Sequence, residues 1–357
     1  MKENNEKKYA LILAGGKGSR LWPISTTNKP KQYLNLYSDN IMINETIKRI
    51  EGIFEYDNIF VITSLEQKEL AERYIDYKIP RENIIYEPMT KNTAMCIFYA
   101  SVLIKEKMGD GIITILSSDH YINPKETFIE NINEGIKIAR CDKNLVTIGI
   151  KPTYPATGFG YIKYHKNVQT NLNDVEEFKE KPSYETAKEY CKSGEYYWNS
   201  GMFIWSIKTI LDIFKMYLPD IYKYKNILEN NINNYQVING VYKNVLSISI
   251  DKGILEKSKN IKMIESKFEW SDIDSINDWF KLKEKNNEKA LNVIGLNNEN
   301  VSAYNAEDEK LLVTLGANNL NIINCNDVIL VANKDRMNEL PEIIKIIKQN
   351  KEYEKYL

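Results

Sequence analysis

Residues 11–23 read Leu11-Ile12-Leu13-Ala14-Gly15-Gly16-Lys17-Gly18-Ser19-Arg20-Leu21-Trp22-Pro23, an apolar run that passes directly into a glycine-rich turn. Glycines carry no Cβ, so backbone N–H groups in such a turn can approach a phosphate closely. The turn lacks the Gly-Lys-Ser/Thr ending of a Walker loop, and Leu21 stands where the dinucleotide fingerprint needs its third glycine. A phosphate cradle is therefore one interpretation, and an ordinary tight loop after a strand is the other.

The segment around this turn alternates strand and helix patterns. We expect strands at residues 9–13, 59–63, 84–86, 112–116 and 146–150, and helices at residues 44–54, 66–76, 93–108 and 125–140. Short apolar strands that alternate with amphipathic helices predict a mostly parallel α/β sheet covered on both faces. Such sheets bind ligands beyond the carboxyl ends of their strands.

The rest of the chain is less regular. Residues 151–286 are expected to form the substrate-facing half of the same domain, with Ser183 capping a helix that Gly194 ends. A charged run at residues 281–289 marks the predicted boundary, giving domains 1–285 and 286–357. Beyond it we expect strands at 292–295, 301–304, 311–315, 320–323 and 328–331 and a closing amphipathic helix.

Composition excludes several classes of protein. The chain has 357 residues, 43% of them hydrophobic and 27% charged, and a formal net charge of −1. No global field draws it to nucleic acid or an anionic membrane, and no signal peptide or spanning segment is evident, so we expect a cytoplasmic protein. Four single cysteines and two histidines argue against zinc sites, disulfide frameworks and Ser-His-Asp catalysis.

Basic residues follow the glycine turn, namely Arg20 and the run Lys29-Pro30-Lys31. Cations here would reach the oxygens of a triphosphate, whereas the alternative is a solvated basic loop. Pro23 and Pro30 stiffen the segment, which favours cations held in fixed positions.

An acidic residue, Asp119, directly follows the predicted strand at residues 112–116. At the carboxyl end of a parallel strand it would hold Mg²⁺ over phosphates, or it would cap a helix. The pattern becomes specific together with Glu87-Pro88-x-x-Lys91-Asn92-Thr93-Ala94 and Trp270-Ser271-Asp272.

With these residues the sequence resembles the sugar nucleotidylyltransferase family, in its mannose-1-phosphate guanylyltransferase branch. Eight segments match in the family's order: residues 14–23 with 29–32, 87–94, 118–122, 149–162, 178–182, 198–203, 249–257 and 269–273. The resemblance implies a Rossmann-like, mostly parallel α/β nucleotidyltransferase domain and a small C-terminal left-handed β-helix domain.

The resemblance also implies an activity. The enzyme would transfer GMP from GTP to mannose 1-phosphate with Mg²⁺ as cofactor, through attack of the sugar phosphate on the α-phosphorus and release of pyrophosphate. This nucleophile is already anionic, so positioning and charge neutralisation would supply the catalysis. Association into a homodimer is left open. The alternatives are another nucleotide, another hexose or heptose 1-phosphate, or a non-catalytic sugar-nucleotide sensor.

The resemblance assigns roles to individual residues. The triphosphate would contact Ala14, Gly15, Gly16, Gly18, Ser19 and Arg20, and Lys31 would face the α-phosphate and leaving group. Asp119 and Asp272 would share Mg²⁺, and with Arg20 and Lys31 they form the expected catalytic set. The base would lie against Glu87, Asn92 and Thr93, and the sugar 1-phosphate against Gly160, Tyr161, Glu180, Lys181 and Asn199.

Two positions depart from the family pattern: Thr26 stands where Arg is common, and Asp274 where Gly is common. Asp274 would either add a third carboxylate beside the metal or cap the helix that follows. The helical apolar spacing of residues 275–283 favours the cap.

Overall fold

A computed structural model describes residues 7–16, 18–141, 143–165, 172–288, 291–307 and 309–357. The chain forms two compact units. Unit 1 contains Met1–Gly15, Ile47–Ser118 and Ile122–Trp270, and unit 2 contains Gly16–Thr46, Asp119–Tyr121 and Ser271–Leu357. Helix α1 (Met42–Ile50) and strands β5 (Tyr121–Asn123) and β11 (Glu269–Ser271) lie where the chain passes from one unit to the other.

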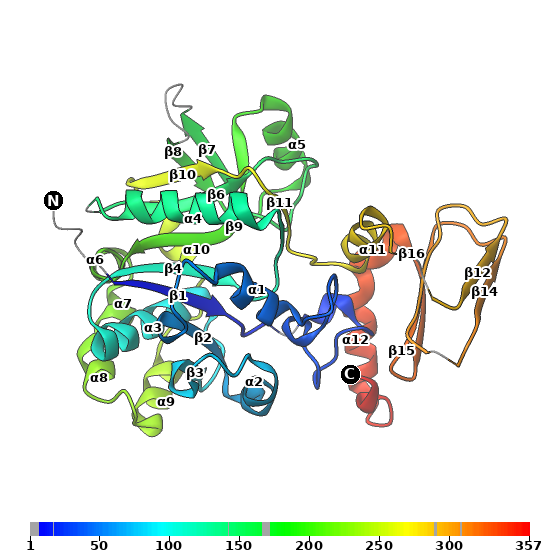
Figure 1. Ribbon diagram of the computed structural model, residues 1–357, viewed down its shortest axis with the longest axis horizontal. Coiled ribbons are helices and arrows are strands. Elements are labelled where there is room, and N and C mark those ends of the chain that lie inside the picture. The colour runs from blue at the N-terminus through cyan, green and yellow to red at the C-terminus, as the bar shows by residue number, and fades with distance from the viewer. Residues whose placement is uncertain (1–6, 17, 142, 166–171, 289–290, 308) are drawn as a thin grey trace. The chain divides into compact units, whose positions relative to one another are not determined.

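Unit 1 is built on a nine-stranded sheet of order β3-β2-β1-β4-β9-β6-β10-β8-β7 (Figure 1). The strands are β1 (Lys8–Leu13), β2 (Ile59–Ser64), β3 (Ile84–Glu87), β4 (Ile112–Ser117), β6 (Leu145–Ile150), β7 (Tyr161–His165), β8 (Leu172–Lys179), β9 (Tyr196–Ser206) and β10 (Ile261–Glu265).

The register brings the carboxyl ends of the first strands to one edge. In parallel pairing, Leu13 at the end of β1 lies opposite Ile62 of β2 and Ser117 of β4. Most strands point in this direction, as predicted, but β9 runs antiparallel to both β4 and β6, and β8 runs antiparallel to β10. The sheet is therefore mixed, because β9 is inserted from a distant part of the sequence.

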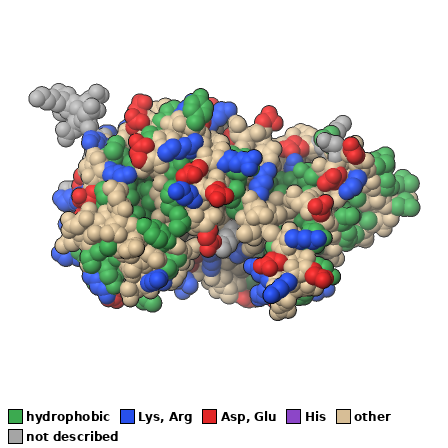
Figure 2. Space-filling view, turned by 90° about the horizontal axis from the view of Figure 1, so that it is seen from below, with side chains coloured by type: hydrophobic (Ala, Val, Ile, Leu, Met, Phe, Trp, Pro, Cys, Tyr) green, Lys and Arg blue, Asp and Glu red, His purple; other side chains and the backbone are tan. Residues whose placement is uncertain are grey.

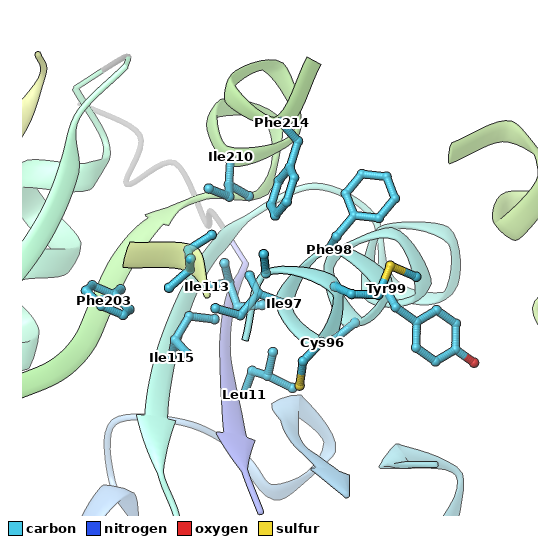
Figure 3. Packing of buried hydrophobic residues seen from close by; sticks show 14 of the residues in the cluster. Leu11, Cys96, Ile97, Phe98, Tyr99, Ile113, Ile115, Phe203, Ile210 and Phe214 are labelled. Carbon is cyan, nitrogen blue, oxygen red and sulfur yellow. The ribbon is translucent and has the colours of Figure 1, made fainter. Parts of the chain in front are cut away.

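Helices cover both faces of this sheet, which confirms that prediction. They are α2 (Lys68–Tyr74), α3 (Asn92–Met108), α4 (Lys125–Ala139), α5 (Tyr184–Ser193), α6 (Ile207–Tyr217), α7 (Pro219–Tyr222), α8 (Lys225–Glu229), α9 (Tyr235–Asn244) and α10 (Ile250–Gly253). On one face, Phe98 of α3 and Phe214 of α6 pack at 4.9 Å between ring centroids, in the buried cluster that contains Phe203 (Figure 3). On the other face, α4 packs so closely that a Cβ at Gly135 would require the end of the Ile204 side chain to move.

The predicted ends of α5 are confirmed. The Ser183 hydroxyl accepts a hydrogen bond from the backbone N–H of Thr186 at 3.3 Å, and Gly194 ends the helix in the left-handed conformation with φ 72°. A serine oxygen satisfies a free N–H of the first turn, and glycine adopts positive φ without a Cβ clash.

Unit 2 contains small sheets and the helices that pack beside them. They are β12 (Val293–Leu296), β13 (Ser302–Asn305), β14 (Leu312–Leu315), β15 (Leu320–Cys325) and β16 (Val328–Asn333), with α11 (Ile276–Lys285) and α12 (Leu340–Gln349). β12 pairs in parallel with β14, and β13 with β15. Asn300 bonds to Asn319, 19 residues further along, so one turn of chain lies on the next. The strands and the closing helix expected beyond residue 286 are present, within a unit that also contains residues 16–46, 119–121 and 271–285.

The core of unit 2 joins its first and last segments. Leu21 and Trp22 belong to the same buried cluster as Ile273 and Trp279. The Trp279 indole N–H donates to the Leu36 carbonyl at 3.0 Å, and that of Trp22 donates to the Tyr356 carbonyl at 2.7 Å. The segment that follows the glycine turn is thus fixed by the C-terminal residues.

Apolar side chains remain exposed on the strand pair β12 and β14. Ile294, Leu296, Val313 and Leu315 are each 56–71% exposed. Figure 2 shows apolar side chains gathered over the region that Figure 1 labels β12 and β14. Within the described part of the chain, no helix is both long and apolar enough to cross a membrane.

Candidate functional site

The glycine turn leaves β1 with open space on its side-chain faces. A Cβ at Gly15 or Gly16 would meet no atom within 4 Å, whereas one at Gly18 would lie 2.5 Å from the Lys31 Cβ. Gly18 also has φ 62°, a conformation that favours glycine. The Gln32 side-chain amide donates to the Gly16 carbonyl at 3.0 Å. The turn therefore rests on the segment that carries Lys31.

Lys31 is the centre of the predicted catalytic set in unit 2. It is only 5% exposed, and its Nζ lies 3.0 Å from Asp119 Oδ2 and also donates to the Asp272 backbone carbonyl. A buried ammonium needs such acceptors, because an unpaired charge inside a protein is strongly destabilising. The structure therefore brings Lys31, Asp119 and Asp272 together, as the sequence predicted.

The turn after Asp272 has an unusual backbone. Ile273 is fully buried with φ 45°, which is strained for a β-branched residue. Its N–H donates to Ser271 Oγ at 3.1 Å, and the Asp274 N–H donates to Asp272 Oδ1 at 3.2 Å. Burial of the isoleucine and these bonds hold the two carboxylates on one tight turn.

The predicted helix cap at Asp274 is wrong. Ser275 caps α11, accepting from the Asp278 N–H at 3.1 Å, while Asp274 forms an ion pair with Arg20. The Asp274 carboxylate is oriented toward Arg20. The local sequence could not predict this contact, because Arg20 lies 254 residues away. Asp274 is thus a third carboxylate beside Asp272.

The other departure from the family pattern, Thr26, closes a turn: its hydroxyl accepts from the Lys29 N–H at 3.1 Å.

The carboxylates of unit 2 differ in the direction in which their pKa values are shifted. Burial favours the neutral form of Asp119, but the charges of Lys31 and His120 outweigh it, and its pKa is lowered. Burial and then the neighbouring charge of Asp274 raise the pKa of Asp272 to about 7, against the opposing effect of Lys31. Burial also raises the pKa of Asp274, although Arg20 opposes it. Ionisation is therefore favoured at Asp119 and opposed at Asp272 and Asp274.

A cavity of about 230 Å³ opens beside these residues, lined by Gly18, Ser19, Arg20, Leu21, Lys31, Ile273 and Asp274. Cationic side chains and backbone N–H groups on such a surface suit a phosphate chain. Carboxylate oxygens such as those of Asp119 and Asp272 suit a hard divalent cation. Among the residues described, no group of three or more His, Cys, Asp or Glu side chains is arranged to hold a metal on its own.

The residues expected at the base lie at the end of β3 and the start of α3, but they face different ways. The Glu87 carboxylate is buried and accepts from the Tyr242 hydroxyl at 3.0 Å. Burial raises its pKa to about 7, although Tyr242 and Cys96 donate hydrogen bonds to it. The Asn92 side chain is exposed, and the Thr93 hydroxyl accepts from the Ile250 N–H at 2.8 Å.

The residues expected at the sugar 1-phosphate lie together in unit 1. A Cβ at Gly160 would come within 2.8 Å of Glu180 Oε2, so the missing side chain leaves room for that carboxylate. Lys181 Nζ lies 3.4 Å from Glu180 Oε1. The Asn199 N–H donates to the Gly160 carbonyl at 2.8 Å. Tyr161 is the exception, because its buried hydroxyl donates to the Ala156 carbonyl at 2.9 Å.

Sequence reasoning missed two residues of these clusters. Tyr242 is far from Glu87 in sequence and belongs to no motif. Asp251, which accepts from the Asn199 side chain at 3.0 Å, lies in the segment 249–257 that matched the family pattern without receiving a role.

Comparison with known proteins identifies the family to which the chain belongs. The sequence profile of the family described as Nucleotidyl transferase matches residues 9–289. Mannose-1-phosphate guanylyltransferases of Escherichia coli and Klebsiella pneumoniae are each 32% identical over 352 residues, which is 96% of this chain and 74% of theirs. A crystal structure from Thermus thermophilus, described as a mannose-1-phosphate geranyltransferase, superposes with a TM-score of 0.84 at 27% identity, covering 96% of this chain and 99% of that one.

The buried Glu87 carboxyl predicts a pH-dependent stability. Its pKa rises from 4.5 to about 7 on folding, so ionisation opposes folding and wild type loses stability as the pH rises through this range. Relative to Glu87→Gln, wild type should lose about 3 kcal/mol between pH 4.5 and 7.5. Urea unfolding at several pH values measures this, with the exposed Glu82→Gln as control. Parallel stability curves for wild type and Glu87→Gln would contradict the prediction.

Proposed function

Because the chain belongs to the nucleotidyl transferase family and is a sugar-phosphate nucleotidyltransferase, we propose that it transfers GMP from GTP to mannose 1-phosphate. The products would be GDP-mannose and pyrophosphate. The observation that carries this choice of substrates is the 32% identity, over 96% of the chain, to relatives named for that reaction. The phosphate-binding features around Lys31 support the chemistry.

The proposed step is one in-line displacement. An oxygen of the sugar phosphate attacks the α-phosphorus, the bond from that phosphorus to the bridging oxygen breaks, and pyrophosphate leaves with the electron pair. The nucleophile carries its negative charge already, so no general base is needed. Catalysis then rests on positioning and on neutralising charge as pyrophosphate departs.

We assign the triphosphate to the glycine turn with Arg20, and the α-phosphate and leaving group to Lys31. The Lys31 ammonium is already desolvated and its position is fixed by Asp119. A preorganised cation of this kind stabilises developing charge without reorganising during the reaction. Glu87, Asn92 and Thr93 are assigned to the base, and Glu180, Lys181 and Asn199 to the sugar 1-phosphate.

Enzymes of this family typically use a divalent metal, and we propose Mg²⁺ held by Asp119 and Asp272. The donor set fits, since both side chains are carboxylates, and a bound cation would relieve the repulsion that raises the pKa of Asp272. When bound, such an ion neutralises phosphate charge.

For the domains, we propose that residues 1–285 carry both substrate sites and that residues 286–357 form a short left-handed β-helix module with a closing helix. The parallel strand pairs and the positive φ of Asn297, Asn300 and Asn319 support this coil. The cytoplasmic location stays a prediction from the sequence.

Pyrophosphate release tests the function directly. Wild type is incubated with each common nucleoside triphosphate and several sugar 1-phosphates, and GTP with mannose 1-phosphate should give the highest kcat/KM. A higher value for another pair would replace these substrates while keeping the chemistry.

Lys31→Met should lower kcat about 100-fold or more while changing the KM for GTP much less, because its charge matters most as pyrophosphate leaves. Steady-state kinetics measures both, with the exposed Lys345→Met as control. A raised KM at unchanged kcat would make Lys31 a ground-state anchor instead.

Asp119→Asn and Asp272→Asn should each raise the Mg²⁺ concentration for half-maximal activity by roughly 10-fold or more, since each removes a charged oxygen ligand. A Mg²⁺ titration measures this beside Asp220→Asn, whose side chain is 85% exposed. Unchanged metal dependence in either variant would remove that residue from the proposed ligands.

The exposed apolar side chains of β12 and β14 support a homodimer, because burying them against a second copy is favourable. Light scattering should give twice the chain mass of 41.6 kDa for wild type. The double variant Ile294→Asp with Val313→Asp should be monomeric, and Ile346→Asp on α12 should not. A monomeric wild type would disprove the dimer.

A further inference from the structure

Asp251 is held at the sugar side of unit 1 from two directions. It lies in α10, whose first N–H groups are satisfied by other side chains: Ile250 donates to Thr93 Oγ1 at 2.8 Å, and Lys252 to Ser249 Oγ at 3.3 Å. Its own Oδ1 accepts from Asn199 Nδ2 at 3.0 Å.

The orientation of the Asn199 amide is fixed as well. Its Oδ1 accepts from the Gly201 N–H at 3.2 Å, and it lies 3.2 Å from the Thr147 hydroxyl, which shares its proton between this oxygen and the Met202 carbonyl. The Nδ2 group must therefore point at Asp251. In the described contacts of Asp251, the other carboxylate oxygen, Oδ2, has no side-chain donor.

Glu180 presents a matching oxygen. Its side chain is 10% exposed, and Lys181 lies nearest to Oε1, whereas Oε2 faces the space that Gly160 leaves. The Glu180 backbone N–H is fixed by Glu256 Oε1 at 3.0 Å. Across the described part of the chain, no hydrogen-bond donor reaches Oε2.

In the described part of the chain, each of these two carboxylates has one oxygen to which no side chain donates. Both residues are partly buried, and they are close enough to interact electrostatically, which is costly. Burial and then the charge of Glu180 raise the pKa of Asp251 to about 7, and Lys181 offsets this only in part. Neutral donors relieve this cost without adding charge, and the hydroxyls of a hexose are such donors.

We propose that Asp251 is a second acceptor for sugar hydroxyls and that, together with Glu180, it determines which hexose 1-phosphate is accepted. The two carboxylates take different, neighbouring hydroxyls of one ring. The inference rests on the proposed function, because it deepens the role of the sugar side.

The test is a cycle of variants and substrates. Wild type, Asp251→Asn, Glu180→Gln and the exposed control Asp220→Asn are assayed with the preferred hexose 1-phosphate and with analogues that each lack one ring hydroxyl. Asp251→Asn should raise the KM for the sugar about 10-fold or more and leave the KM for GTP within about 2-fold. Thermal melting checks that every variant is folded.

The decisive readout is the cost of removing each hydroxyl. For one particular ring hydroxyl, its removal from the substrate should lower kcat/KM about 10-fold or more in wild type. The same removal should lower kcat/KM less than about 3-fold in Asp251→Asn. In Glu180→Gln, the kcat/KM should likewise change little when a hydroxyl is removed, but for a different hydroxyl of the ring. The inference is overturned if Asp251→Asn keeps every wild-type penalty.

A second variant distinguishes direct contact between Asp251 and the sugar from an indirect effect of Asp251 through the orientation of Asn199. Thr147→Val removes a donor from Asn199 but keeps the Asp251 carboxylate, so it should keep the hydroxyl penalties of wild type. If Thr147→Val and Asp251→Asn behave alike, Asp251 acts only by orienting Asn199, and the inference fails. If wild type prefers another hexose 1-phosphate, the proposed substrate fails, and the cycle run with that sugar still decides the role of Asp251.

Discussion

The Lys31 ammonium is almost completely withdrawn from water, and the residues around it in unit 2 are arranged to accommodate it. A buried cation requires acceptors within reach, which Asp119 and the Asp272 carbonyl provide. The glycine turn lies against the stem of the same lysine, so Gly18 has no space for a side chain. One side chain thus ties three segments that are far apart in the sequence.

These segments keep their geometry because an apolar core surrounds them. Ile273 adopts a left-handed backbone that its branched side chain disfavours, yet it is fully buried in the cluster that contains Leu21 and Trp279. Burial of that side chain offsets the strain, and the hydrogen bond from the Asp274 N–H to Asp272 Oδ1 closes the turn that carries both carboxylates. Through this packing, the C-terminal segments of unit 2 support the residues to which we assign the phosphates.

The first half of unit 1 could be predicted from the sequence because its signals are local. Apolar periodicity and short turns gave the strands and helices of residues 9–150 closely. The reversed strand β9 could not be predicted, since its place between β4 and β6 depends on pairing across long stretches of chain.

The candidate site shows the same limit. Local propensity favours Asp274 as a cap, but Arg20, 254 residues away, takes its carboxylate. Tyr242 reaches Glu87 across 155 residues. Motif resemblance, which carries information about distant contacts, is what grouped Lys31 with Asp119 and Asp272.

The parallel strands of unit 2 repeat at an interval of 19 residues, and this constrains how the protein can evolve. Ile294 lies opposite Val313, and both side chains face outward. Inserting one residue between them would turn every later side chain of β14 to the opposite face. Insertions and deletions in these strand pairs are therefore better tolerated in the turns, or as whole intervals of 19 residues, than within a strand. We therefore expect length changes in these strands to come in multiples of 19 residues. Such changes would leave the residues that contact Lys31 unaltered.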